Sequence, residues 1–410
     1  MMQLSNREDD GRTIVSKTVF VSNNSTSCPD ADDATEVGAD DSTSAHYSDT
    51  ASSKSKTLNL MMISCEENPP YGPSKDTAIM FLELFCQAYE KKCSLREVMN
   101  IDREQQHECS LLADCSYYYL TIRISIYLAQ SDDYPFTSSE WSSYDGILIP
   151  GSLSAAYDNT NVEWIEKLQS VIRNDIHRRR LKTMGVCFGH QCFAHAFGSS
   201  EDRIGKEGII GGEREEGGRA IKCPTGSKAG RISSQLTHEG RQLLLLDGTA
   251  STNSDSEECS MELLYTHGDM VESLPEFAIS LGGNANVPIE ACAYFSSKED
   301  KVLFQKQLQQ HQHQEHHVGD DDDGTNKDTS TVTSIKVQPY AFTFQAHPEY
   351  ISPTGFNVNY INTVQAMEDR GYITQQVSKE ACEDARVNFG KVREDSLEVV
   401  IAVATAFGWF

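Results

Sequence analysis

Short apolar runs and helical stripes of apolar residues alternate along the first half of the chain. Runs that are apolar throughout or at every second position predict strands, and apolar residues three or four positions apart predict helices with one buried face. The predicted strands are 58–64, 120–128, 145–150 and 182–186. The predicted helices are 76–89 and 162–176. This alternation indicates an α/β fold with a doubly wound, mostly parallel sheet, in which ligands bind at the carboxyl ends of the strands.

The second half of the chain carries a denser series of short strands. They are predicted at 205–212, 219–223, 243–246, 263–266, 277–281 and 289–295. Consecutive short strands without intervening helices predict a smaller antiparallel strand layer beside the parallel sheet. Two helical segments, 358–370 and 378–392, follow.

Two polar tracts interrupt this pattern. Residues 22–56 are dominated by Ser, Thr, Asp, Asn and Ala, and residues 299–334 contain the runs QKQLQQHQHQEHH and DDDDG. Such compositions bury too little apolar surface to offset the entropy lost on folding. We therefore expect a disordered tail over 1–56, one large domain over 57–370, and a helical extension over 371–410. The tract at 299–334 is expected to loop out of a hairpin as a low-complexity insertion.

The segment MGVCFGHQ, residues 184–191, places Cys187 between two glycines where an apolar strand turns into a helix. The glycines permit a tight turn with φ values that a side chain would resist, and they let the helix pack close to the strand. A thiol at a helix N-terminus faces unpaired N–H groups and the positive end of the helix dipole, which favour a thiolate. This setting predicts a nucleophile, although most free cysteines are simply small buried residues.

A second segment, FQAHPE at residues 344–349, supplies a base and a carboxylate at the end of another apolar run. His347 can accept and return a proton, and Glu349 can accept a hydrogen bond from the other ring nitrogen and so fix the tautomer. Pro348 has a fixed φ and keeps the segment out of a helix. We expect Cys187, His347 and Glu349 to converge as a nucleophile–base–carboxylate triad.

These two segments resemble those of class I glutamine amidotransferase domains, which pair a Gly-x-Cys-x-Gly-x-Gln turn with His-Pro-Glu. The similarity extends to YDGILIPG at residues 144–151 and THGDMVESLP at residues 266–275. The chain resembles the free-standing members of the family, a subgroup similar to γ-glutamyl peptidases. The resemblance implies a flavodoxin-like sheet and attack of the cysteine on an amide carbonyl, through a thioester intermediate.

The tetrahedral intermediate of such a reaction needs N–H donors already aimed at its oxyanion. The strand–turn–helix geometry assigns one donor to the backbone of Phe188, which immediately follows the nucleophile. The resemblance implies a second donor at the strand end formed by Gly151 and Ser152, two residues that also fit a plain tight turn.

The resemblance further implies contacts to a γ-glutamyl substrate from Gln191 and from the backbone around Thr266 and His267. Relatives carry Ser-His-Gly-Asp where this chain has Thr-His-Gly-Asp, which retains the hydroxyl. Gln191 alternatively only caps a helical turn. His267 lacks a carboxylate placed two residues on across a proline, so His347 is the preferred base.

Charge and composition exclude several classes of partner. The formal net charge of −26, from 35 basic and 61 acidic residues, disfavours nucleic acid and anionic membranes. No apolar run approaches the ~20 residues of a membrane helix, and the N-terminus lacks the apolar core of a signal peptide. Twelve scattered cysteines fit neither a disulfide framework nor a zinc site, which favours a reducing compartment such as the cytosol.

No cofactor or metal is expected. The glycines at 208–212 lack the strand–turn–helix context of a nucleotide-binding loop. The four histidines of the second polar tract lie in low-complexity sequence, without the defined shell that a metal site needs. These histidines are His311, His313, His316 and His317.

Three functions remain open at this point. A conventional glutamine amidotransferase subunit would release ammonia for a synthase on a partner chain, whereas a γ-glutamyl peptidase would cleave glutathione-like compounds. About sixty helical-looking residues follow the His-Pro-Glu, so we expect no fused synthase domain, which slightly favours the peptidase. The alternative is a regulatory or binding module that keeps the fold without turnover and uses the acidic tail for interaction.

Overall fold

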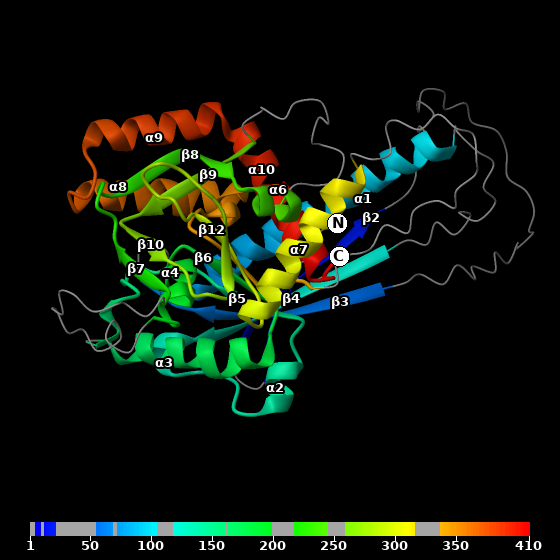
Figure 1. The fold of residues 1–410 in the computed structure, drawn as a ribbon. Coiled ribbons are helices and arrows are strands. Elements are labelled where there is room, and N and C mark those ends of the chain that lie inside the picture. The colour runs from blue at the N-terminus through cyan, green and yellow to red at the C-terminus, as the bar shows by residue number, and fades with distance from the viewer. Residues whose placement is uncertain are drawn as a thin grey trace, which may run out of the picture.

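The computed structural model describes residues 5–9, 12–21, 55–68, 72–104, 118–160, 162–198, 217–244, 259–315 and 337–410. Its centre is an 11-stranded sheet in the order β1-β2-β4-β3-β5-β6-β13-β12-β11-β8-β9 (Figure 1). The strands of this sheet are β1 (Ser5–Asp9), β2 (Arg12–Val21), β3 (Ser55–Ser64), β4 (Tyr118–Leu128), β5 (Gly146–Ile149), β6 (Thr183–Val186), β8 (Lys228–Leu236), β9 (Ser260–His267), β11 (Ala278–Gly283), β12 (Ala291–Tyr294) and β13 (Ala341–Phe344). Two further strands, β7 (Arg219–Lys222) and β10 (Asp269–Ser273), form a separate antiparallel pair.

The strands β4, β3, β5, β6 and β13 run parallel to one another in the middle of the sheet. Antiparallel strands flank them, β2 and β1 on one side and β12, β11, β8 and β9 on the other. The predicted α/β doubly wound sheet is thereby confirmed. The predicted antiparallel strands mostly extend the same sheet, and only β7 and β10 lie apart from it.

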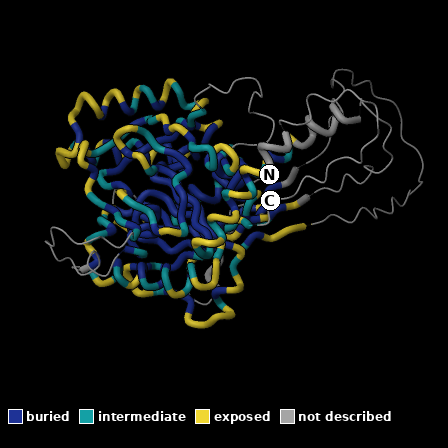
Figure 2. The backbone as a smooth tube through the Cα atoms, viewed as in Figure 1, coloured by how far each residue is buried: buried dark blue, intermediate teal, exposed yellow. Residues whose placement is uncertain are grey.

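Helices cover both faces of the sheet, as the continuous apolar strands predict. Alternate residues of β3 enter two different cores, Leu60 and Met62 on one face and Met61 and Ile63 on the other. The first core packs against α1 (Ser74–Glu104) and α10 (Phe389–Ala406), and the second against α3 (Glu163–Val171) and α4 (Phe188–His195). The two groups of helices lie on opposite sides of the strands in Figure 1, and Figure 2 shows the buried sheet between them.

The remaining described helices are shorter or more peripheral. They are α2 (Ser138–Ser142), α6 (His238–Leu244), α7 (Lys298–Glu315), α8 (Ile361–Asp369) and α9 (Gln375–Val387). Two π-helical turns, Ile172–His177 and Gly355–Tyr360, continue α3 and precede α8. No helix in the described part of the chain is both long and apolar enough to span a membrane.

The N-terminal region was predicted to be disordered, but its described residues form the strands β1 and β2. β2 pairs with β4 from Ile14 to Val21, and Val15 and Val19 are buried against the core. Val15, Lys17 and Val19 stand at alternate positions and are all buried, the period of a strand with one buried face, but the lysine and the polar surroundings concealed this signal. Residues 22–54 lie outside the described part of the chain.

The second polar tract is helical over its first half, which corrects the prediction of an unstructured insertion at 299–334. Phe304 and Leu308, one helical turn apart, are buried on the inner face of α7. Residues 316–334 lie outside the described part. The flanking strands β12 and β13 pair directly, which confirms that the tract leaves a hairpin.

The strands of the second half differ from the predicted ones in two places. The segment 243–246 was expected to be a strand, but His238–Leu244 forms the helix α6. The Thr237 hydroxyl caps the start of this helix by accepting a hydrogen bond from the Gly240 N–H at 3.0 Å. The predicted strand 205–212 lies outside the described residues. The long strand β8 was missed because glycine, serine and arginine interrupt its apolar positions.

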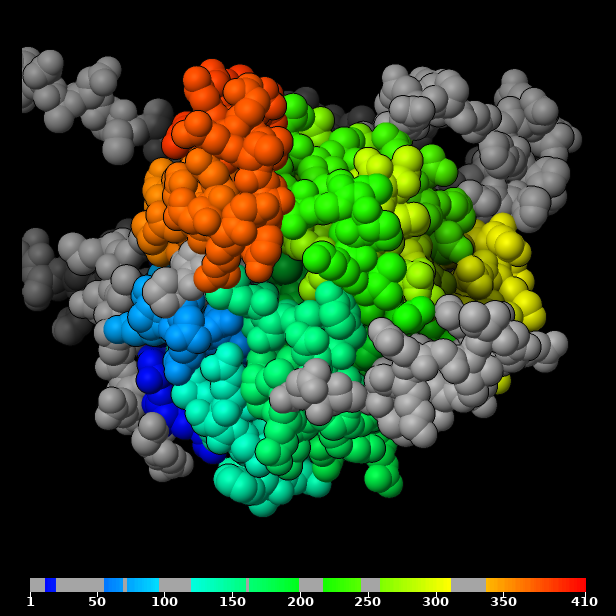
Figure 3. Space-filling view, turned by 90° about the vertical axis from the view of Figure 1, so that its left-hand side faces the viewer, coloured from blue at the N-terminus to red at the C-terminus, as the bar shows by residue number. Residues whose placement is uncertain are grey.

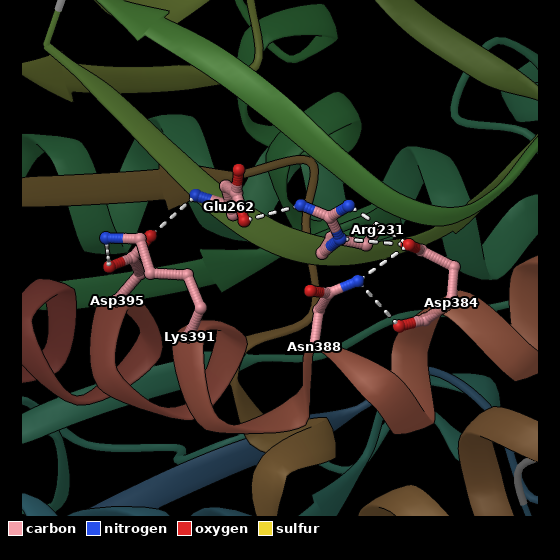
Figure 4. Close-up of polar contacts among 6 residues, drawn as sticks. All are labelled: Arg231, Glu262, Asp384, Asn388, Lys391 and Asp395. Carbon is pink, nitrogen blue, oxygen red and sulfur yellow. Dashed lines mark hydrogen bonds and ion pairs between the residues drawn. The ribbon is translucent and has the colours of Figure 1, made fainter.

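The C-terminal segment is helical as expected, but α10 is part of the first core rather than an appendage. A polar network ties it and α9 to β8 and β9 (Figure 4). Its members are Arg231, Glu262, Asp384, Asn388, Lys391 and Asp395. The Arg231 guanidinium donates to both carboxylate oxygens of Asp384 and to Glu262, so one cation joins the strands to α9.

One buried carboxylate predicts a pH-dependent stability. Burial raises the pKa of Glu290 from its ordinary value of 4.5 to about 8, although Tyr265 and Asn284 donate hydrogen bonds to it. The native protein therefore keeps a proton that the unfolded chain releases. This contribution is fully present below about pH 4.5 and is lost as the pH rises to 8, on the order of 4 kcal/mol in total.

We expect Glu290→Gln to flatten this pH dependence. Urea unfolding at several pH values between 5 and 8.5 should show the wild type losing stability relative to the variant as the pH rises. Glu276→Gln provides a control, because Glu276 is an exposed carboxylate paired with Lys298. Parallel stability curves for wild type and Glu290→Gln would contradict the prediction.

Candidate active site

The carboxyl ends of β6 and β13 lie side by side and carry the two sequence segments singled out above. The strands pair in parallel, with Val186 opposite Phe344. The Cys187 N–H then donates to the Phe344 carbonyl at 2.8 Å. Because neighbouring parallel strands end at the same edge of the sheet, residues far apart in sequence leave it at the same point.

Cys187 occupies a strained turn between β6 and α4. Its φ of 52° and ψ of −105° lie outside the regions that a residue with a side chain normally adopts. Such a conformation costs about 1–3 kcal/mol and is found mainly where function requires it. Cys187 is only 4 % exposed.

The two flanking glycines are needed for close approach rather than for their φ values, which corrects part of the sequence argument. A Cβ on Gly189 would lie 2.1 Å from the Ile149 carbonyl oxygen, and one on Gly185 would lie 2.9 Å from the Thr343 methyl group. The positive φ belongs to Cys187 itself. Glycine therefore lets α4 pack against β5 and β6, as expected.

His347 and Glu349 meet as predicted. The His347 Nδ1 and Glu349 Oε1 are 2.7 Å apart, and both side chains are almost fully buried. The Tyr350 ring stacks on the imidazole at 4.3 Å with the two planes 6° apart, which holds the ring in place. The backbone N–H of His347 donates to the Leu264 carbonyl on β9 at 2.9 Å.

The electrostatic surroundings of His347 favour the imidazolium. Burial by itself lowers the pKa of His347, but the charges of Glu349 and Cys187, and a hydrogen bond from each side chain, raise it to about 10. The side chains of Cys187, His347 and Glu349 are therefore in mutual contact through the imidazole.

The candidate oxyanion-hole residues lie around the sulfur. Ser152 lines the same cavity as Cys187, and Gly151 and Phe188 are buried next to these two in the chain. The Ser152 hydroxyl donates to Glu66 at 3.3 Å and accepts from the Ser154 N–H at 3.1 Å. The side chain of Ser152 thus fixes the conformation of its loop.

The candidate substrate-binding residues Gln191, Thr266 and His267 also line this cavity, but their side chains already form hydrogen bonds within the protein. The Gln191 amide donates to the Asp269 carbonyl and to Gln345 Oε1, both at 3.1 Å. The hydroxyl of Thr266 shares a hydrogen bond with the Tyr350 hydroxyl at 3.1 Å. The two N–H groups of the Gln191 amide therefore connect α4 to the backbone at Asp269 and to the side chain of Gln345.

His267 differs from His347 in its partner. Its Nδ1 donates to the Asp269 backbone carbonyl at 2.8 Å, so no carboxylate supports the ring. Burial lowers the pKa of His267 to about 4, which keeps the imidazole neutral. The Nε2 atom of this neutral ring is a buried acceptor without a hydrogen-bond partner in the described part of the structure.

Gln345 is a contact of the sulfur that the sequence argument missed. Its fully buried amide donates to Cys187 Sγ at 3.7 Å and accepts from Gln191 at 3.1 Å. The spacing offered a signal, because Gln345 precedes His347 by two residues and alternate residues of an extended segment share a face.

Glu66, at the end of β3, was also missed. Its carboxylate is 6 % exposed and accepts from the Ser152 hydroxyl and the Leu153 N–H, both at 3.3 Å. Its other oxygen accepts from the Glu67 and Asn68 N–H groups at 3.1 and 3.0 Å. Glu66 thus fixes the loop that carries Ser152. A single carboxylate in a polar loop offered no sequence signal for this role.

The contact between Gln345 and the sulfur predicts a change in thiol reactivity. In Gln345→Glu an N–H donor near the sulfur is replaced by a carboxylate, which disfavours a thiolate. We expect alkylation of Cys187 by iodoacetamide at pH 7 to slow about ten-fold and its pH dependence to move upward.

The exposed Gln338 supplies the control, since Gln338→Glu introduces the same carboxylate away from the cavity. Mass spectrometry of the Cys187 peptide measures the rate directly. If Gln345→Glu reacts at the wild-type rate, the amide makes no contribution to the state of the sulfur.

Five of the residues singled out from the sequence line one cavity of about 520 Å³ (Figure 3); they are Ser152, Cys187, Gln191, Thr266 and His267. Its inner part contains Cys187 and Gln191, and α8 and the turn that follows it form one wall. In Figure 3 the hollow lies where the orange surface of α8 and α9 meets the green strands and the loop after β5. The volume lies within the ~300–1,000 Å³ typical of small-molecule sites.

The described residues contain no cluster of three or more His, Cys, Asp or Glu side chains that could hold a metal ion. Two of the histidines considered from the sequence, His316 and His317, lie outside the described residues, and the side chains of His311 and His313 are not described.

The chain is similar in sequence to a known family and to two characterised or named proteins. Residues 111–366 match the family model described as "Glutamine amidotransferase class-I". Gamma-glutamyl peptidase 5 of Arabidopsis thaliana is 28% identical over 153 residues, 37% of this chain and 49% of that protein. A Saccharomyces cerevisiae protein named as a candidate glutamine amidotransferase is 28% identical over 159 residues, 38% of this chain and 50% of that protein. The chain thus spans about half the length of these relatives.

Two solved structures resemble the fold at low identity. A glutamine amidotransferase from Thermotoga maritima has a TM-score of 0.43 and 10% identity, covering 85% of this chain and 98% of that chain. The glutaminase domain of a Trypanosoma brucei CTPS has a TM-score of 0.35 and 12% identity, covering 77% of this chain and 94% of that chain.

Proposed function

Because the chain belongs to the class I glutamine amidotransferase family, we propose that it hydrolyses γ-glutamyl amide bonds with Cys187 as the nucleophile. The observation that carries this proposal is the contact of His347 with both Cys187 and Glu349 beneath a cavity, with Cys187 held in a strained turn. A structural cysteine needs neither the strain nor the charged partner.

The proposed reaction begins with attack of the Cys187 sulfur on the γ-carbonyl carbon. The C=O electrons move to the oxygen, and the backbone N–H groups of Phe188 and of Gly151 or Ser152 stabilise the oxyanion. His347 donates its proton to the amide nitrogen, the C–N bond breaks, and the amine leaves. Glu349 keeps the imidazole oriented throughout.

The second half of the reaction hydrolyses the thioester. His347, now neutral, accepts a proton from water while the water oxygen attacks the same carbon. The C–S bond breaks, glutamate leaves, and the imidazolium is restored. The reaction consumes one water and needs no cofactor or metal.

Two substrate classes fit this chemistry, glutamine and γ-glutamyl peptides such as glutathione. A glutamine amidotransferase would pass ammonia to a synthase chain, whereas a γ-glutamyl peptidase acts alone. The match to a plant γ-glutamyl peptidase supports the second class. The cysteines in the described part of the chain are all free, which fits a reducing compartment such as the cytosol.

The test is a panel of γ-glutamyl substrates combined with a trap for the intermediate. We expect the full-length protein to release glutamate from glutathione or glutamine, and rapid acid quenching to show a glutamyl adduct on the Cys187 peptide. If no substrate yields glutamate and Cys187 is alkylated no faster than the unfolded chain, the protein is instead a binding module with the amidotransferase fold.

A further inference from the structure

We infer that α8 and the turn into α9 form a subsite for the leaving group of γ-glutamyl peptides, in which Arg370 binds the free carboxylate of the departing amino acid. This inference rests on the proposed function and specifies its substrate class. The subsite consists of Met367, Arg370 and Tyr372, together with Leu153 from the loop after β5, all of which line the cavity.

The size of the cavity favours a leaving group larger than ammonia. Ammonia released from glutamine is comparable to a water molecule, which takes ~30 Å³ in the liquid. The cavity measures about 520 Å³ and extends from Cys187 to the end of α8. A substrate confined to glutamine would leave this outer wall without a contact.

The position of α8 relative to His347 suits a leaving group. The imidazole must protonate the departing nitrogen, so that nitrogen and the groups attached to it lie on the imidazole side of the sulfur. Tyr350 stacks on His347 at 4.3 Å, and its hydroxyl shares a hydrogen bond at 3.1 Å with Thr266, which lines the cavity. Thr363 of α8 lines the same cavity as Cys187, so α8 contributes to the wall around the sulfur.

The chemistry of this wall fits an apolar amino acid with a free carboxylate. Leu153 and Tyr372 are 42% and 60% exposed where they line the cavity, so both offer apolar surface to a ligand there. Arg370 is exposed on the same wall, and no described carboxylate forms an ion pair with it. A free guanidinium beside apolar groups in a chain of net charge −26 is suited to an anionic ligand.

Other residues of the cavity lining offer partners for the glutamyl end. Asp269 lies opposite Lys222 in the β7–β10 register, so a carboxylate and an ammonium group adjoin each other there. Asp158 and His267 line the same part of the cavity, and the Nε2 of His267 is an unpartnered acceptor. A zwitterionic α-amino acid head is matched by these groups, which leaves Arg370 for a second carboxylate.

The test compares γ-glutamyl-leucine with γ-glutamyl-leucine amide, which differ only in the carboxylate at the leaving end. For the wild type we expect kcat/KM to be about ten-fold higher for the acid, equivalent to about 1.4 kcal/mol, through KM. Arg370→Gln should abolish this preference and leave kcat/KM for glutamine within two-fold. Arg386→Gln, which removes an exposed cation of α9 away from the cavity lining, should keep the preference.

The outcomes separate the two proposals. Turnover of both leucine compounds at equal rates by the wild type, or a preference that survives Arg370→Gln, overturns the subsite while the hydrolase function stands. An equal loss for glutamine and the dipeptide in Arg370→Gln also overturns it, because the arginine would then act on the common part of the reaction. Failure to form a glutamyl adduct on Cys187 with any compound overturns the proposed function and the subsite with it.

Discussion

Cys187→Ala should lower glutamate release from every γ-glutamyl substrate by at least ~10⁴-fold, because no other group can form the thioester. Removing the nucleophile of a triad generally leaves only the residual contribution of substrate binding and the oxyanion donors. The fold should survive, because the substitution removes only the sulfur atom of a side chain that is 4 % exposed. Glutamate release and thermal unfolding of the same preparation measure both effects.

Cys192→Ala is the matched control for this prediction. Cys192 lies five residues further on, within α4, and is fully buried in the second core. Burial raises the pKa of its thiol, which makes it an inert core residue. Cys192→Ala should cost some stability and leave kcat within a few-fold. Full activity in Cys187→Ala would refute the proposed chemistry irrespective of the structure.

Gly189→Ala should destabilise the protein by about 3 kcal/mol or more and reduce activity at least ~100-fold. The new Cβ would lie 2.1 Å from the Ile149 carbonyl oxygen, a backbone atom that cannot move aside without shifting β5. Since β5 leads into Gly151 and Ser152, either α4 or the candidate oxyanion loop must move. Displacement of about 1 Å in such groups costs ~10²-fold in rate.

Gly390→Ala in α10 tests whether this effect comes from the contact or from the loss of glycine. A Cβ on Gly390 meets nothing within 4 Å, so alanine there should be neutral or stabilising by up to ~1 kcal/mol through helix propensity. Urea unfolding gives the free energies of unfolding of both variants. Trapping of the glutamyl adduct on Cys187 shows whether the turn still presents the nucleophile. A Gly189→Ala variant as stable and active as Gly390→Ala would show that the helix does not pack on β5 as described.

Local patterns in the sequence predicted where the candidate site residues lie better than they predicted which polar tracts contain strands or helices. The turn around Cys187 and the segment from His347 to Glu349 are local patterns, in which residue type and spacing determine the backbone geometry. The same holds for the alternating strands and helices between residues 58 and 186, whose periodicity follows from burial on one or two faces. Polar composition misled the prediction at β2 and α7, because a few apolar residues at the right spacing suffice to anchor a strand or a helix.

The sequence by itself determined which residues are the candidates for the nucleophile and for proton transfer, and that a doubly wound sheet would carry them. Only the tertiary structure decided that β6 and β13 are neighbours, so that Cys187 and His347 meet across a long stretch of chain. It also decided that Gln345 contacts the sulfur, that Glu66 anchors the loop of Ser152, and that α8 walls the cavity. The reason is physical: periodicity records how each segment is buried, whereas the choice of neighbours depends on packing between segments that no local pattern specifies.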